Sequence, residues 1–115
     1  MNRLYRKLPE IIQSALLVSE GWLVGSSIGQ ILEEKKVNDF DIIVPNPNLY
    51  IITCKWLQTL STDSRVNSFG GMKFELPGNI DIDIWPEELD HFLKNANKLE
   101  YFYSMKKNIL LKNHE

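Results

Sequence analysis

Two stretches decide the fold, Asp39-Phe40-Asp41-Ile42-Ile43-Val44 and Ile80-Asp81-Ile82-Asp83-Ile84. Side chains two residues apart in a β-strand point to the same face of the sheet. Each stretch therefore predicts a strand with one apolar and one acidic face, and if the strands are neighbours they gather up to four carboxylates in one patch. Two like charges about 4 Å apart cost on the order of 4 kcal/mol at an effective dielectric near 20. Such a patch indicates a cation that neutralises it.

Carboxylate oxygens without accompanying His or Cys favour Mg²⁺ or Mn²⁺ over zinc. These ions bind protein carboxylates together with substrate phosphates, and a pair of them stabilises phosphoryl displacement. A single Asp-x-Asp pair is equally well explained as the solvated face of an antiparallel sheet. Two such pairs, on strands whose other faces are apolar, favour a metal site over a solvated face.

A second motif lies just upstream, where Trp22-Leu23-Val24 predicts a short buried strand and Gly25-Ser26-Ser27 a sharp turn into a helix. The first amide groups of a helix have no partner within it, so a phosphate can bind there. The plainer interpretation is that a serine caps the helix. Because the Asp39 strand directly follows this helix, the turn and the aspartates are expected at the ends of adjacent strands.

Hydrophobic periodicity and turn residues predict the remaining elements. Helices are expected at 8–20, after 27 up to about 36, at 49–60 and from Pro86, and strands at 22–24, 39–44, 66–69, 72–76 and 80–85. Within 49–60, Ile51-Ile52-Thr53 would also suit a strand. This order predicts an α+β domain with a mixed sheet of about five strands and helices mainly on one face. The apolar and basic segment 98–111 is expected to dock as a helix over the sheet, or to form a face for a partner or a second copy, with 99–111 as the contact.

Length and composition exclude several classes of protein. The 115 residues carry 13 Lys and Arg against 15 Asp and Glu, a net charge of −2, which excludes a nucleic-acid binder driven by bulk positive charge. The single cysteine, Cys54, excludes an internal disulfide, and no apolar run approaches the roughly 20 residues of a membrane span. We expect one domain over 1–115, with its core at about 20–90 and a tail at 86–115, in the cytoplasm.

Three motifs in this order resemble the DNA polymerase beta-type nucleotidyltransferase superfamily: Gly25-Ser26, Asp39-Phe40-Asp41-Ile42 and Ile82-Asp83-Ile84. The segment from Leu23 to Ile42 is similar to the head of poly(A) polymerases and CCA-adding enzymes. Residues 68–73, followed by 82–85, look like the minimal stand-alone bacterial and phage members. The resemblance covers about residues 20–90.

The resemblance implies a reaction in which a nucleoside monophosphate moves from an NTP, with ATP the expected nucleotide, to a hydroxyl, releasing pyrophosphate. Gly25 and Ser26, with Ser27 beside them, would hold the nucleotide phosphates. Asp39 and Asp41 would bind two divalent ions, Mg²⁺ or Mn²⁺.

The third metal-binding carboxylate is assigned to Asp83 because Asp-Ile-Trp matches the family strand, and Asp81 is the reserve candidate. Lys73, on the preceding strand, is either a counter-charge for the triphosphate or a solvated strand lysine. Trp85 is expected in the core, with contact to a nucleobase as the alternative.

The family usually adds a helical domain. The roughly 30 residues after the strand of the third motif, Ile82-Asp83-Ile84, are too few for one. The resemblance therefore implies a protein or RNA acceptor, and either a partner protein that supplies the missing domain or a minimal version of the family. Minimal members often act as antitoxins that modify a HEPN-type toxin. Two alternatives remain open: a non-catalytic binding or regulatory protein that keeps the fold, and a small α+β interaction module with solvated aspartates.

Overall fold

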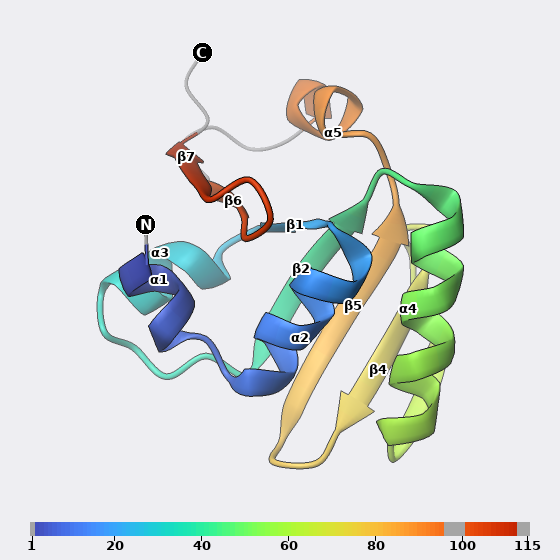
Figure 1. Cartoon of the computed structure of the whole chain (residues 1–115). Helices are drawn as coiled ribbons and strands as arrows, with labels where there is room; N and C mark the ends of the chain where they lie inside the picture. The colour runs from blue at the N-terminus through green and yellow to red at the C-terminus, as the bar shows by residue number, and fades with distance from the viewer. Residues whose placement is uncertain (1, 96–100, 113–115) are drawn as a thin grey trace.

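A mixed seven-stranded sheet organises the chain in the computed structural model, which describes residues 2–95 and 101–112. The strand order is β3-β4-β5-β2-β1-β6-β7, and β2 and β5 at its centre run parallel (Figure 1). The strands are β1 (Trp22–Val24), β2 (Asp39–Val44), β3 (Asp63–Val66), β4 (Met72–Leu76), β5 (Ile80–Pro86), β6 (Tyr101–Ser104) and β7 (Ile109–Lys112). The helices are α1 (Asn2–Lys7), α2 (Glu10–Ser19), α3 (Ser27–Leu32), α4 (Pro47–Leu60) and α5 (Leu89–Asn95).

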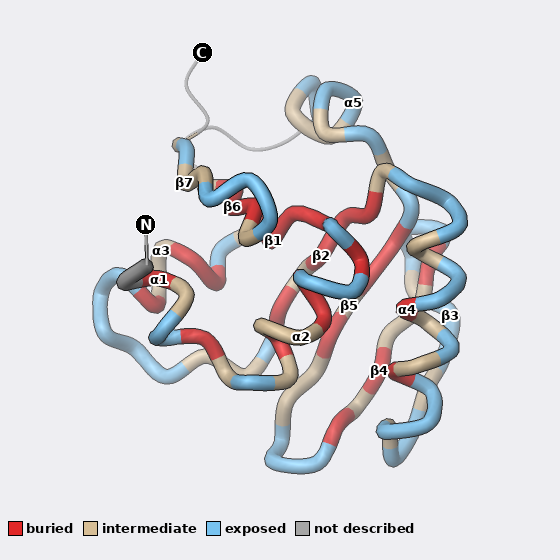
Figure 2. The backbone as a smooth tube through the Cα atoms, viewed as in Figure 1, coloured by how far each residue is buried: buried red, intermediate tan, exposed pale blue. Residues whose placement is uncertain are grey.

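The main core lies between the sheet and α2 and α4, which cover the same face (Figures 1 and 2). The alternating strands direct Phe40, Ile42, Ile82 and Ile84 into this core, where each is at most 1% exposed. Leu57 of α4 is fully buried there as well. The apolar side chains of both Asp-x-Asp strands therefore take one face, and the aspartates take the other, as the period of two predicts.

The opposite face is apolar only at one end. There Trp22, Ile43, Trp85 and Phe102 form a second buried cluster, against which Phe92 of α5 and its neighbours pack. The rest of this face carries the charged side chains described below. The expected α+β class and the placement of helices mainly on one face are confirmed.

Local sequence explains where α4 begins. The Asn46 side chain accepts hydrogen bonds from the N–H groups of Asn48 and Leu49, and Pro47 occupies the first turn. This is an N-cap with proline at a position that needs no amide donor. The segment 49–60 is thus helical, as predicted. The turn at 77–79 joins β4 to β5, also as predicted.

The C-terminal segment was predicted wrongly. Residues 101–112 form a β-hairpin that extends the sheet beyond β1, where Leu23 pairs with Tyr103. Tyr103 is 1% exposed and Phe102 7%, so the aromatic residues alternate between the two sheet faces and a helix would not bury both. The two strands of this hairpin account for a sheet of seven strands instead of about five. Residues 98–100 of the expected docking segment lie outside the described residues.

Other elements also differ from the prediction, beginning with α3, which ends at Leu32 instead of near residue 36. The strand expected at 66–69 is β3, Asp63–Val66, because Asn67 begins a hydrogen-bonded loop that returns to β4. The last helix begins at Leu89, since Pro86 is still in β5. Helix α1 was not foreseen. Across the described residues, no helix has the length and apolar character needed to cross a membrane.

Candidate functional site

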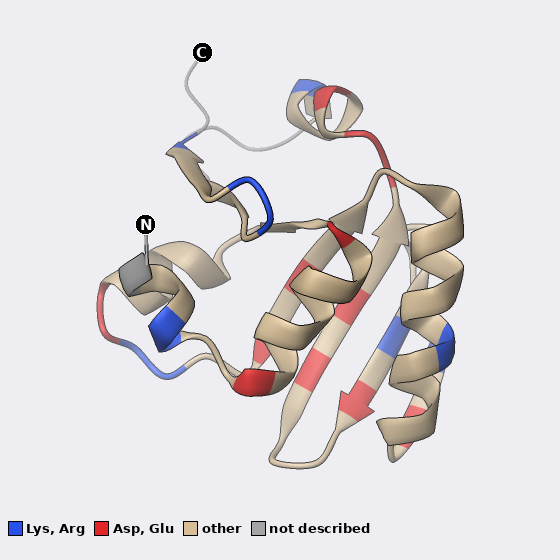
Figure 3. Cartoon of the chain, viewed as in Figure 1, with Lys and Arg blue, Asp and Glu red and all other residues tan. Residues whose placement is uncertain are grey.

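The charged face of the sheet is organised in rows that run across the strands, because paired residues on neighbouring strands share a face. The acidic row contains Asp39 on β2, Asp81 on β5, Glu75 on β4 and Asp63 on β3. The mixed row, which lies two residues away on each strand, contains Asp41, Asp83, Lys73 and Arg65. Figure 3 shows the acidic bands of β2, β5 and β4 beside one another. The apolar row beyond them contains Trp22, Ile43 and Trp85.

The parallel pairing of β2 with β5 brings the two Asp-x-Asp motifs together. Asp39 pairs with Asp81, and Asp41 pairs with Asp83. The two charged rows hold six carboxylates against two basic side chains. Such an excess of negative charge on adjacent strands is unfavourable unless protons or cations offset it.

Asp81 shows the effect of this crowding. Burial raises the pKa of its carboxyl, and the charges of Asp39 and Glu75 add to the rise against the opposing effect of Lys73. Asp81 thus tends to keep its proton to higher pH than an ordinary aspartate. A divalent cation beside these carboxylates would offset the part of the rise that comes from Asp39 and Glu75.

The variant Asp81→Asn, in metal-free buffer with chelator, is expected to be more stable than the parent chain at pH 7, and the advantage should shrink as the pH falls towards 4. A raised carboxyl pKa means that the folded state binds more protons than the unfolded state, so stability declines as pH rises through this window. Asparagine does not titrate, so the variant lacks this decline. Urea unfolding of both chains between pH 3.5 and 7.5 measures the difference in their free energies of unfolding. A difference that stays constant with pH would contradict the prediction.

Asp83 is held by two neighbours. Lys73 Nζ lies 3.3 Å from its Oδ2 atom, and Asn67 Nδ2 donates to its Oδ1 atom at 3.2 Å. The side chains of Lys73 and Asp83 are only 23% and 17% exposed. Burial opposes the charge of Lys73, but Asp83, Asp81 and Asp39 together raise the pKa of its ammonium group. Lys73 is therefore a charged counter-ion of the carboxylates and not a freely solvated lysine.

The Gly25 turn lies directly against Asp41. Gly25 has φ +81°, and a Cβ atom placed on it would be 2.6 Å from Asp41 Oδ2. The sequence placed the turn and the carboxylates at adjacent strand ends, and the turn lies against one of these carboxylates, Asp41. Only glycine combines this backbone conformation with so close an approach.

The serines of the turn do not behave as a simple helix cap. Ser26 occupies the N-cap position of α3, but its side chain makes no capping hydrogen bond and instead accepts one from Gln30 Nε2 at 3.3 Å. Ser27 is 3% exposed, and its Oγ atom has no hydrogen-bond partner within the described part of the chain. A buried hydroxyl without a partner is uncommon and calls for an explanation.

The donor set fits Mg²⁺ or Mn²⁺ in its chemistry, because it consists of carboxylate oxygens with excess negative charge. Asp39, Asp41 and Asp83 would hold such ions, with Asp81 adjacent. Within residues 2–95 and 101–112, however, no three carboxylate, thiol or imidazole groups converge as a ready-made metal site. Asp83 instead has Lys73 and Asn67 as neighbours, at 3.3 Å and 3.2 Å.

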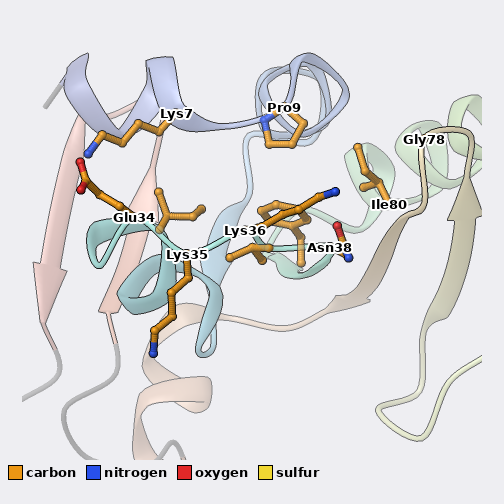
Figure 4. A pocket seen from close by; sticks show the side chains of 11 residues that line it. Lys7, Pro9, Glu34, Lys35, Lys36, Asn38, Gly78 and Ile80 are labelled. Carbon is orange, nitrogen blue, oxygen red and sulfur yellow. The ribbon is translucent and has the colours of Figure 1, made fainter.

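A separate cavity of about 440 Å³ opens near the start of β2 and β5 (Figure 4). Lys7, Lys36, Phe40 and Ile80 are among its lining residues. Asp39 lies between two lining residues in sequence, but its side chain is on the charged face of the sheet and does not line the cavity. None of the sequence-predicted site residues lines this cavity.

Asn67 is the residue that sequence reasoning missed. It accepts hydrogen bonds from the N–H groups of Phe69 and Gly71, and it also donates to Asp83. The signal in the sequence was an Asn shortly before Gly-Gly, which indicates a side chain that organises a turn. Its contact with Asp83 spans 16 residues and could not be inferred locally.

Solved structures of CCA-adding enzymes share this architecture. The Thermotoga maritima CCA-adding enzyme complexed with tRNA matches 96% of this chain with a TM-score of 0.69 at 18% identity. The chain has a nucleotidyltransferase fold. CCA-adding enzyme structures with ATP and with CTP match the same 96%, with TM-scores of 0.69 and 0.68 at 18% and 19% identity.

The chain spans 30–31% of the length of these enzymes. No protein-family model matches the chain, and no curated protein does. The nucleotidyltransferase fold agrees with the superfamily that the sequence resembles. These structures are all CCA-adding enzymes, so the narrower resemblance to minimal stand-alone members stays a prediction.

Proposed function

We propose that the chain is a Mg²⁺- or Mn²⁺-dependent nucleotidyltransferase that moves a nucleoside monophosphate from an NTP, with ATP the expected nucleotide, to a hydroxyl acceptor. The observation that carries the proposal is the pairing of Asp41 with Asp83 on parallel strands, with the Gly25 turn against Asp41. A carboxylate pair next to an uncapped helix start combines the two features that a metal-bound triphosphate needs.

In this proposal Asp39, Asp41 and Asp83 hold the divalent ions, and Asp81 stands next to them as an alternative ligand. The ions would supply positive charge that offsets the charge developing on the phosphates. Gly25 and Ser26 hold the phosphates through the backbone at the start of α3, and the buried Ser27 hydroxyl, which lacks a partner among the described residues, is available to them.

Lys73 acts as the counter-charge of the site. It neutralises Asp83 in the free protein, and a cation at Asp83 would release its ammonium group towards the phosphates. Asp83 would then keep only its hydrogen bond from Asn67. The cation would replace the positive charge of Lys73 beside Asp83 while the substrate binds.

The acceptor in this proposal is a hydroxyl on protein or RNA. The partners in this proposal are the acceptor and a protein that supplies a helical domain. An antitoxin role against a HEPN-type toxin in the cytoplasm belongs to the same proposal. The β6–β7 hairpin forms one edge of the sheet. In this proposal a second copy of the chain associates through this hairpin, which covers most of the 99–111 segment.

Thermal unfolding with and without Mg²⁺ and each NTP tests the site. A ligand at 100 times its Kd adds about 2.7 kcal/mol, which raises the midpoint of a domain of this size by several degrees. We expect a shift that requires both metal and nucleotide. Pyrophosphate release in the presence of candidate acceptors then tests turnover. If neither metal nor nucleotide changes the unfolding midpoint, the result favours an interaction module with solvated aspartates.

One observation favours a second candidate, a nucleotide-binding regulatory protein without turnover. Both oxygens of Asp83 already have partners, Lys73 at 3.3 Å and Asn67 at 3.2 Å, so a metal ion at the third carboxylate has to compete with them in the free protein. This candidate predicts a nucleotide-dependent thermal shift with no pyrophosphate release for any acceptor or partner.

A further inference from the structure

An aromatic side chain stands exposed next to the mixed row. Phe69, in the loop between β3 and β4, is 56% exposed, although its ring stacks on Trp85 with centroids 4.6 Å apart and planes 26° apart. Trp85 is only 6% exposed. The two rings thus form a stack with one buried and one outward face, which we call the Phe69 stack.

The stack lies close to the carboxylates. Trp85 follows Asp83 by two residues on β5 and shares its face, which places the two side chains about 6.6 Å apart along the strand. On the other side of Asp83, Asp41 and the Gly25 turn continue the site. An extended ligand whose phosphates lie at the turn would therefore have the stack beyond the carboxylates.

The loop that carries Phe69 is fastened to the site by Asn67. The Oδ1 atom of Asn67 accepts the N–H groups of Phe69 at 3.0 Å and Gly71 at 2.9 Å. Its Nδ2 group donates to the Met72 carbonyl at 3.1 Å and to Asp83 Oδ1 at 3.2 Å. One side chain thus fixes Phe69 and Asp83 relative to each other.

Close packing at Gly71 holds the same loop against β5. A Cβ atom on Gly71 would lie 2.1 Å from the Ile84 carbonyl oxygen and 2.5 Å from the Trp85 Cβ atom. Only glycine fits here, and it brings the loop down onto the strand. The position of Phe69 is therefore fixed by several contacts, although its ring is exposed.

We propose that the outward face of Phe69 is the stacking surface for the nucleobase of the nucleotide that binds at Asp41 and Asp83. This inference rests on the proposed function and names its base-binding element. A single ring with polar neighbours such as Asn67 suits a planar ligand better than a protein partner, which needs a broad apolar patch. Because every base has a π-face, the stack binds the base with little preference among A, G, C and U.

The test compares two ligands that differ by the nucleoside, Mg²⁺-ATP and Mg²⁺-tripolyphosphate, in calorimetric titrations of the whole chain. Stacking is worth about 1–3 kcal/mol per base, so Phe69→Ala should weaken ATP binding about 5- to 150-fold. Tripolyphosphate binding should stay unchanged, and Phe69→Trp should retain ATP affinity. Ile52→Ala, which removes a side chain 53% exposed on α4, is the matched control and should change neither affinity.

The outcomes separate this inference from the proposed function. If Phe69→Ala binds ATP as tightly as the parent chain, Phe69 does not stack on the base. The proposed nucleotide site at Asp41 and Asp83 is then unaffected. If both ligands weaken equally, the loop acts only by positioning Asp83, which also overturns the stacking. If the parent chain binds neither ATP nor tripolyphosphate, the proposed function fails together with the inference.

Discussion

Asp41→Asn is expected to lower nucleotidyl transfer at least about 100-fold while the chain still folds. A metal ion supplies several kcal/mol of charge stabilisation to phosphoryl transfer, and each 1.36 kcal/mol is a factor of ten in rate. Asparagine keeps the shape beneath the Gly25 turn and removes one charge from a face with six carboxylates and two basic groups. Pyrophosphate release and urea unfolding measure the two effects.

The matched control is Asp63→Asn. Asp63 lies on the same face, but on the edge strand β3, and its side chain is 63% exposed. This variant loses the same formal charge at a distance from the Gly25 turn, and we expect transfer to stay within about twofold because surface charge pairs contribute little. Equal losses in both variants would show that the net charge of the face matters and that Asp41 has no special role. Undiminished transfer in Asp41→Asn would refute the proposed site.

The alternating strands were predictable because a period of two is a local property of the chain. Phe40 and Ile82 had to face a core if Asp41 and Asp83 faced solvent, and the helix layer over the apolar face follows from this. The parallel register of β2 with β5 was not predictable in the same way. It joins residues about 40 positions apart, and only the packed sheet decides that Asp41 stands beside Asp83.

Two features escaped prediction for physical reasons. The segment 101–112 is short and apolar, and such runs suit a buried strand or a helix equally until a partner strand is known. Here β1 offered a free edge, and Leu23 pairs with Tyr103. The contact of Asn67 with Asp83 was also hidden, since an Asn near Gly-Gly signals a turn but does not tell which distant group its amide reaches.

Gly25→Ala is expected to destabilise the chain and to abolish the thermal shift produced by Mg²⁺ with ATP. An alanine at φ +81° is strained by roughly 1–3 kcal/mol, which lowers the midpoint by several degrees. The new Cβ atom would lie 2.6 Å from Asp41 Oδ2, so the carboxylate has to leave its place next to Asp83. The strain and the displaced carboxylate are two separate effects of one methyl group.

Gly78→Ala separates these two effects. Gly78 has φ +85° in the turn between β4 and β5, and a Cβ atom there meets nothing within 4 Å. Both alanine variants should therefore lose comparable stability from backbone strain, but Gly78→Ala should keep the full Mg²⁺-ATP shift. Thermal unfolding of both variants, with and without Mg²⁺-ATP, gives the comparison. A Gly25→Ala chain that still responds to Mg²⁺-ATP would mean that the turn does not shape the nucleotide site. Loss of the response in Gly78→Ala as well would trace the effect to general destabilisation, because the strain is then sufficient without any contact to Asp41.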